Sequence, residues 1–264
     1  MSAEIIVSVR SPTRRHGHMG HQRRRPVPDD QLTIALHAHG GARSGAGRPR
    51  SKTSGMPHAA RPTLSGREPL LVTLKVAEGL ASLRSSRLFR RILASLARAK
   101  ERFGTRIVHF SVQSDHVHLL VEAASKTALC RAMKGLAVRL ARAVNRELGR
   151  TGAVLRDRYH ARLLTTPRQT RNAIAYVLCN ARKHAVAPPI PGWLDPCSSA
   201  PTFDGWSRTI CRVDWAVDGM AVAAPATPRV WLLRIGWRRG GLLHPDHCPG
   251  RALGDRVCAG EPLQ

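Results

Sequence analysis

Two histidines separated by one residue, His116 and His118, are the side chains of this sequence best suited to do chemistry. They open the run HVHLLVE, whose apolar and β-branched residues predict a strand over 116–122. Side chains alternate between the two faces of a strand, so both imidazoles are expected on one face, where they can hold one metal ion. Because the chain has 13 histidines, a chance pairing stays open as the alternative.

The preceding run, residues 106–113, is also strand-like, and Ser114-Asp115 fits a two-residue turn. A hairpin with this loop places Gln113 opposite His116 and Ser111 opposite His118. The histidines then lie at the start of their strand, near the end of the sheet, where a substrate can reach them.

A second pair of reactive groups lies on a helix predicted over 166–184, which Thr166 would cap and Pro167 would start. Tyr176 and Asn180 are four residues apart, so they share one helical face. If this helix packs over the sheet, a divalent ion held by the histidines and the Asn180 carbonyl keeps open positions for phosphate oxygens, and Tyr176 can attack the phosphate. The alternative is a half-buried tyrosine and an ordinary polar residue at a helix end.

The charge of the chain points to a polyanionic partner. Lys and Arg number 43 against 17 Asp and Glu, which gives a net charge of +26. Nucleic acid is the simplest such partner, with a membrane surface as the competing one. No apolar run is long enough to span a bilayer, and no secretory signal is evident, so we expect a cytoplasmic, nucleoid-associated protein. The six cysteines lack the paired spacing of zinc ribbons and do not suggest a disulfide scaffold.

A helix predicted over 126–148 carries its cations on one arc, separate from its apolar stripe. A charged strand predicted over 156–165 adds two more cationic side chains to the expected DNA-binding set. The expected DNA-binding residues are Arg131, Lys134, Arg139, Arg142, Arg146, Arg158 and Arg162. A merely solvated cationic face is the alternative.

Three segments follow from composition and pattern. Residues 1–62 are rich in Arg, His, Gly and Pro and are expected to form a disordered basic arm, which either attracts phosphates or has no role of its own. Residues 63–187 have the element order β-α-β-β-α-β-α. That order predicts an α+β, ferredoxin-like split βαβ domain, an antiparallel sheet with helices over one face.

Residues 188–264 form a small C-terminal extension of unknown role. Helix-like pieces are expected within 211–223 and 228–241, with Trp231, Leu232, Ile235 and Trp237 as packing residues. No chemistry is evident in this extension.

The sequence resembles the HUH-type single-tyrosine transposases, in particular the insertion-sequence and REP-associated branch. The resemblance rests on His116-Val117-His118 and on Tyr176 with Asn180. It implies a homodimer of ferredoxin-like domains that binds hairpin-bearing single-stranded DNA and needs Mg²⁺ or Mn²⁺. By position, it implies that Tyr176 is the nucleophile that forms a 5′-phosphotyrosine, and that His116, His118 and Asn180 are metal ligands.

Two other functions stay open at this point. A replication-initiator or relaxase-like nickase would share the chemistry without the mobility. A catalytically inactive hairpin-binding protein would use only the fold and the charge.

Overall fold

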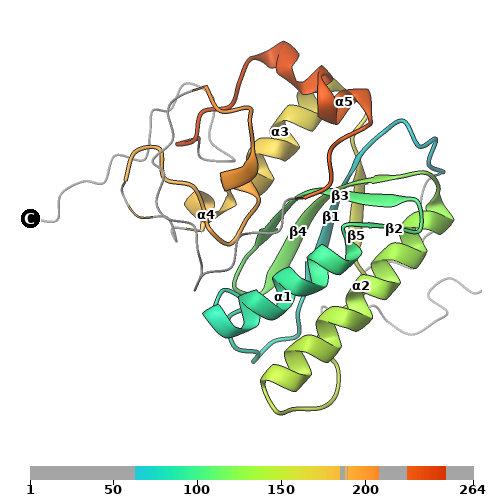
Figure 1. Ribbon diagram of the computed structural model, residues 1–264, viewed down its shortest axis with the longest axis vertical. Coiled ribbons are helices and arrows are strands. Elements are labelled where there is room, and N and C mark those ends of the chain that lie inside the picture. Colours follow the sequence, from blue (N-terminus) through green and yellow to red (C-terminus); the bar gives the residue numbers. More distant parts are fainter. Residues whose placement is uncertain (1–62, 185–187, 189, 208–224, 248–264) are drawn as a thin grey trace, which may run out of the picture. The chain divides into compact units, whose positions relative to one another are not determined.

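The computed structural model describes residues 63–184, 188, 190–207 and 225–247 (Figure 1). The basic arm expected over 1–62 and the helical piece expected within 211–223 lie outside the described residues. The elements are, in chain order, β1 (Leu70–Lys75), α1 (Ser86–Ala99), β2 (Glu101–Arg102), β3 (Thr105–Val112), β4 (His116–Ala123), α2 (Lys126–Glu147), β5 (His160–Leu163), α3 (Pro167–Leu178), α4 (Asn180–Lys183), η1 (Ala200–Thr202), α5 (Trp231–Arg234) and η2 (Gly236–Gly240).

One sheet of five strands organises this part of the chain. Its strand order is β2-β3-β4-β1-β5, and each pair of neighbours is antiparallel. β4 lies between β1 and β3, although the chain runs from β1 through α1 to β3. This is the split βαβ arrangement, so the predicted α+β, ferredoxin-like class is confirmed.

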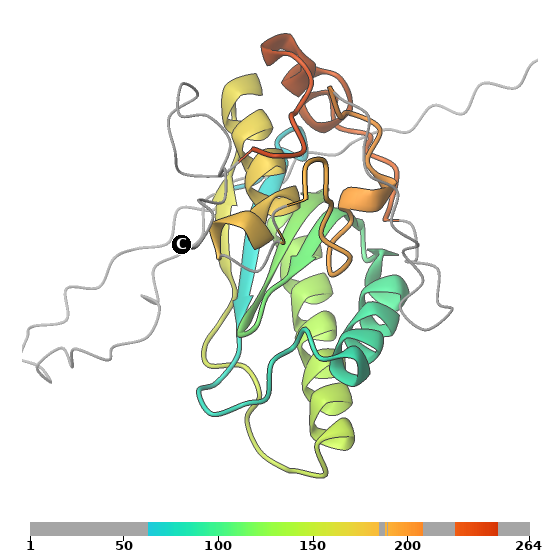
Figure 2. The same cartoon turned by 90° about the vertical axis from the view of Figure 1, so that its left-hand side faces the viewer.

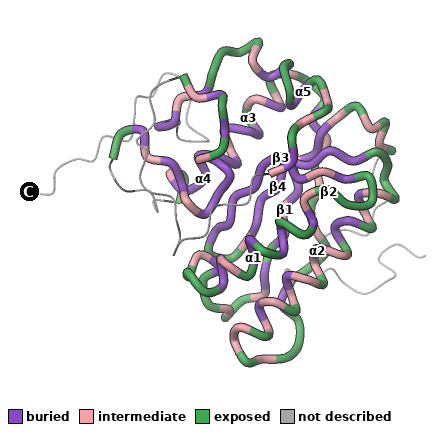
Figure 3. The backbone as a smooth tube through the Cα atoms, viewed as in Figure 1, coloured by how far each residue is buried: buried purple, intermediate pink, exposed green. Residues whose placement is uncertain are grey.

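The strands feed two separate hydrophobic layers, because their apolar side chains alternate between the faces. On β4, Val117, Leu119 and Val121 pack in the layer that contains the apolar faces of α1 and α2. Leu120 points the other way and packs with the buried residues of α3. Figure 2 shows α1 and α2 on one side of the sheet and α3 on the other, and Figure 3 shows the buried strands between them. The prediction of helices over one face is therefore correct for α1 and α2 and wrong for α3.

The C-terminal residues that are described pack onto the α3 side of the sheet. Trp237 of η2 is 1% exposed and lies in the same apolar layer as α3. Two buried ion pairs fasten these residues to the rest of the fold: Arg84 with Asp195 at 2.7 Å, and Arg182 with Asp246 at 2.6 Å. These pairs join positions 111 and 64 residues apart, so the extension completes the second layer.

A buried histidine in β3 makes the stability of the fold depend on pH. His109 packs edge-on against Phe203, with ring centroids 5.3 Å apart, and burial lowers its pKa from 6.5 to about 4. Between pH 6.5 and about 4, His109 binds a proton in the unfolded chain but not in the folded one. The stability that neutral His109 contributes is therefore fully present above pH 6.5 and is lost as the pH falls toward 4. Across that window, His109→Gln should lose less stability than the wild type, by on the order of 3 kcal/mol. Urea unfolding at both ends of the window measures this. Equal losses in both proteins would contradict the assignment to His109.

Candidate active site

The two histidines lie where the β3–β4 hairpin was expected to place them. Ser111 pairs with His118, and the Gln113 amide donates to the His116 carbonyl at 2.8 Å, so the predicted register is confirmed. Both imidazoles stand on the α3 side of the sheet, at the start of β4, with ring centroids 4.5 Å apart. His118 is buried and His116 is half-buried, so only the outer ring of the pair meets solvent.

Neighbouring residues fix which nitrogen each ring presents. Thr73 Oγ1 of β1 lies 2.9 Å from His118 Nδ1, and Asp115 Oδ1 lies 2.6 Å from His116 Nδ1. A hydrogen bond at Nδ1 orients the ring and leaves Nε2 as the available ligand atom, as it does for metal-binding histidines in general. The lone pairs best placed to hold a cation are therefore the two Nε2 atoms.

α3 brings Tyr176 to this pair. The helix begins where the sequence indicated: the Thr166 side chain accepts from the Gln169 amide, and Pro167 occupies the first turn. Tyr176 Oη lies 3.3 Å from His118 Nε2, with ring centroids 4.9 Å apart. The phenol and the inner imidazole are thus in direct contact, although 58 residues separate them in the chain.

The helix predicted over 166–184 is interrupted at Cys179, which caps α3 and precedes α4. Asn180 therefore opens a new short helix instead of stacking one turn below Tyr176 in a continuous one. Its side chain is fully buried, and in the part of the chain that the structure describes neither its amide oxygen nor its amide nitrogen has a hydrogen-bond partner. A buried polar group without a partner is costly, and a bound ligand would supply the missing interaction.

This donor set fits a divalent cation. Two imidazole nitrogens and one amide oxygen are ligands that such ions accept. The buried Asn180 amide, which has no hydrogen-bond partner among the described residues, is the candidate for the third ligand. Among residues 63–184, 188, 190–207 and 225–247, no group of three His, Cys, Asp or Glu side chains could hold a metal ion.

Burial and charge set the protonation of the site. Burial, together with the charges of His116, His184 and Lys183, lowers the pKa of His118 to about 3. His118 is therefore a neutral imidazole at physiological pH, which is the form that binds metals. Burial raises the pKa of Tyr176 above its ordinary value, so the isolated site favours the neutral phenol. A nucleophilic Tyr176 needs a nearby positive charge to stabilise its phenolate.

Two further residues at the site come from α4 and its end, and the sequence pattern did not single them out. The His184 ring lies 5.5 Å from that of His116, and Lys183 Nζ lies 5.1 Å from the centre of the Tyr176 ring. They lie seven and eight residues beyond Tyr176, about two turns along the helix predicted over 166–184, and this spacing was a usable signal. Thr73 could not have been found in this way, since its contact depends on the pairing of β1 with β4.

The expected DNA-binding residues fall into two groups in space. Arg162 of β5 pairs with Leu71 and shares the sheet face of the histidines, and Arg158 is exposed just before β5. The five cations of α2 belong to a helix that packs on the opposite face of the sheet. The structure therefore does not bring the α2 cations to the histidine pair.

Comparisons with known proteins give two matches. The family model described as "Transposase IS200 like" matches residues 82–177, a segment that includes both histidines and Tyr176 and ends before Asn180. Among solved structures, a REP-associated tyrosine transposase bound to a REP hairpin is similar, with 15% sequence identity and a TM-score of 0.48; the match covers 66% of this chain and 99% of that one. No curated protein matches the sequence.

Proposed function

Because residues 82–177 match the model of the IS200-like transposase family, we propose that this protein is a DNA transposase that cleaves and rejoins single-stranded DNA through a 5′-phosphotyrosine at Tyr176. The proposed substrate is a strand with a hairpin near the cleavage position. The observation that carries the proposal is the 3.3 Å contact between Tyr176 Oη and His118 Nε2, which joins the nucleophile to the cation-binding pair.

The proposed metal ligands are the side chains of His116, His118 and Asn180. When bound, a Mg²⁺ or Mn²⁺ ion would withdraw charge from the phosphate oxygens and favour the phenolate. The lone pair of His118 Nε2 can either bind a cation or accept the hydrogen bond from the Tyr176 hydroxyl, but not both at the same time. Thr73 and Asp115 keep both Nε2 atoms turned toward the substrate side. Lys183 adds a positive charge beside the Tyr176 ring.

In the proposed reaction, Tyr176 Oη forms a bond to the scissile phosphorus while the bond from phosphorus to the 3′ oxygen breaks. The phenol loses one proton and the leaving oxygen gains one, which yields a free 3′-hydroxyl. The reverse attack of a 3′-hydroxyl on the phosphotyrosine rejoins a strand and restores Tyr176. Bond energy is conserved in the covalent intermediate, so rejoining needs no nucleotide cofactor.

The test of this function is covalent capture of DNA. The protein is incubated with end-labelled hairpin-bearing single-stranded DNA and Mn²⁺, and the products are separated in SDS. An adduct that resists SDS and disappears with a metal chelator supports the proposal. Tight binding without any adduct would favour the alternative of an inactive hairpin-binding protein. A joining assay with donor and target strands separates a transposase from a nickase, because only the former transfers the captured strand.

The proposed partner is DNA, and the expected assembly is a homodimer acting at the nucleoid in the cytoplasm. None of the helices in the described part of the chain combines the length and apolar character that a bilayer-crossing helix requires.

The α2 cations provide a separate test of the DNA-binding surface. Replacing the exposed Arg131, Lys134, Arg142 and Arg146 by Gln should reduce the slope of log affinity against log salt by about 0.7 for each phosphate that these side chains neutralise in the wild type. The slope is measured by titrating labelled single-stranded DNA at several salt concentrations. Arg87→Gln on α1 is the control for a single exposed cation elsewhere. An unchanged slope in the fourfold variant would show that these α2 cations do not contact DNA. That result would fit the position of α2 on the sheet face away from Tyr176.

A further inference from the structure

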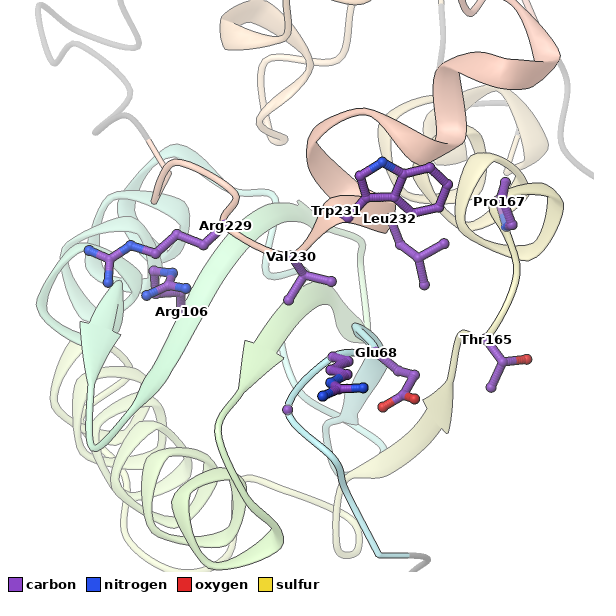
Figure 4. Close-up of a pocket in the computed structure, with 10 residues that line it drawn as sticks. Glu68, Arg106, Thr165, Pro167, Arg229, Val230, Trp231 and Leu232 are labelled. Carbon is purple, nitrogen blue, oxygen red and sulfur yellow. The ribbon is translucent and has the colours of Figure 1, made fainter.

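We propose that a pocket beside the start of α3 binds one unpaired nucleotide of the DNA strand, with its base stacked on Trp231. This inference rests on the proposed function and adds a second contact point for the same substrate. The pocket has a volume of about 590 Å³ and lies between the segment before β1, the start of α3 and the segment leading into α5 (Figure 4). Its size falls within the range of small-ligand sites, which is sufficient for one nucleotide.

A buried carboxylate holds the wall of the pocket in place. Glu122 of β4 is 3% exposed and accepts hydrogen bonds from the backbone amides of Arg229 and Val230 at 2.8–3.1 Å. It also accepts from Arg106 Nη2 at 2.8 Å, which neutralises that guanidinium. The segment that carries Trp231 is therefore anchored to the sheet before any ligand binds. A preorganised wall reduces the entropy cost of binding.

The aromatic surface of the pocket is Trp231, which the sequence had suggested as a packing residue. It is 43% exposed, in contrast to its neighbour Leu232 at 7%. Its six-membered ring lies against Gly236, where an added Cβ would come within 2.7 Å, and the Arg239 guanidinium sits 4.9 Å from its centre. These contacts fix the indole and leave part of its surface toward the pocket. An exposed, fixed aromatic ring is what proteins use to stack unpaired bases.

Two guanidinium groups at the rim can receive the phosphates. Arg67 is exposed and makes no ion pair among the described residues, and Arg229 is 71% exposed with a single surface contact to Glu101 at 3.4 Å. Such an exposed pair is weak and is readily replaced by a phosphate. Glu68, the one carboxylate among the described residues that line the pocket, accepts a hydrogen bond from Ser65. A polyanionic ligand with a flat apolar base suits this combination better than a neutral peptide does.

α3 connects the pocket to the candidate active site. Pro167, in its first turn, lines the pocket, and Tyr176 lies nine residues further along the helix. At a rise of 1.5 Å per residue, Pro167 and Tyr176 are about 14 Å apart along the axis of α3. That span equals about four nucleotides of a stacked strand at 3.4 Å each, and fewer if the strand is extended. A strand cleaved at Tyr176 can therefore reach the pocket with a base close to the cleavage position.

The test compares a strand that has bases with one that lacks them. Full-length protein carrying Tyr176→Phe, which cannot cleave, is titrated with fluorescein-labelled oligo(dA) and with an abasic strand of equal length. Trp231→Ala should weaken binding of oligo(dA) about 10-fold and leave the abasic strand nearly unchanged, since stacking needs a base. Trp231→Phe should keep most of the affinity. Ile235→Ala, which removes an exposed apolar side chain of the same segment outside the pocket, is the matched control.

Equal effects of Trp231→Ala on both strands, or no effect on either, would overturn the stacking site. Replacing Arg67 and Arg229 by Gln should weaken both strands alike. Because cleavage is absent throughout, the result is independent of the proposed chemistry. An adduct in the cleavage assay without a Trp231 effect rejects the nucleotide pocket alone, and a Trp231 effect without an adduct rejects the transposase chemistry alone.

Discussion

Replacing Tyr176 by Phe is expected to abolish the covalent protein–DNA adduct and to reduce strand cleavage by at least about 1,000-fold, because the proposed covalent bond forms at the Tyr176 oxygen, which phenylalanine lacks. The substitution removes one oxygen atom. The ring contact with His118, at a centroid distance of 4.9 Å, can stay, so the variant should fold and bind DNA as the wild type does. Adduct formation on denaturing gels, measured beside DNA affinity in the same preparations, checks both parts of this expectation.

The chain supplies its own matched control for this experiment, since it has a second tyrosine and no third. Tyr159 packs against the hydrophobic layer of α1 and α2, and its hydroxyl lies 3.5 Å from Cys130 Sγ, on the side of the sheet away from the histidines. Tyr159→Phe should therefore form the adduct at the wild-type rate. If Tyr159→Phe lost the adduct and Tyr176→Phe kept it, the assignment of the nucleophile would be wrong.

The parts of this site that the sequence predicted are those that depend on local periodicity. The alternation of β4 put His116 and His118 on one face, and the short hairpin fixed Ser111 opposite His118. Both follow from a few consecutive residues. The first turn of α3 was equally local, because Thr166 and Pro167 mark it directly. What these patterns leave undetermined is the face of the sheet on which each helix packs.

The helices show this limit clearly. The apolar stripe of α2 predicted that this helix packs on the sheet, and its cations predicted a separate, exposed arc. No pattern within α2 indicates which face of the sheet it covers. It covers the face opposite Tyr176, so the five α2 cations and the histidine pair are on different sides. The break at Cys179 was also missed, because nothing in the run from Tyr176 to His184 contains a Gly or Pro to interrupt a helix.

The C-terminal extension was the least predictable part, since its contacts are made across long separations by single polar residues. Nothing near Glu122 in the sequence indicates that its carboxylate anchors the backbone of Arg229. In the same way, nothing in the sequence marks Arg84, just before α1, or Asp195 as partners, because the chain has 43 Lys and Arg residues. Their pairing becomes visible only once the second layer is assembled.

That pairing is expected to be one of the largest single contributions to the stability of the fold. Arg84 donates from Nη2 to Asp195 Oδ1 at 2.7 Å and from Nη1 to Asp195 Oδ2 at 2.9 Å, and its Nη1 also reaches the Val112 carbonyl at 2.9 Å. The Asp195 side chain is 2% exposed, so Arg84→Ala leaves a buried charge without its partner. We expect a loss of about 3–5 kcal/mol in the free energy of unfolding, measured by urea denaturation.

Two comparisons separate this effect from a general cost of removing an arginine. Arg156→Ala breaks an exposed pair with Glu78, whose side chain is 81% exposed, and should cost about 0–1 kcal/mol. The double variant Arg84→Leu with Asp195→Leu should be less destabilised than the sum of its single variants, because neither charge is then left buried alone. Strict additivity would mean that Arg84 and Asp195 act independently. In that case the C-terminal extension would be held mainly by its apolar contacts around Trp237, and losing the ion pair would leave the second layer of the sheet in place.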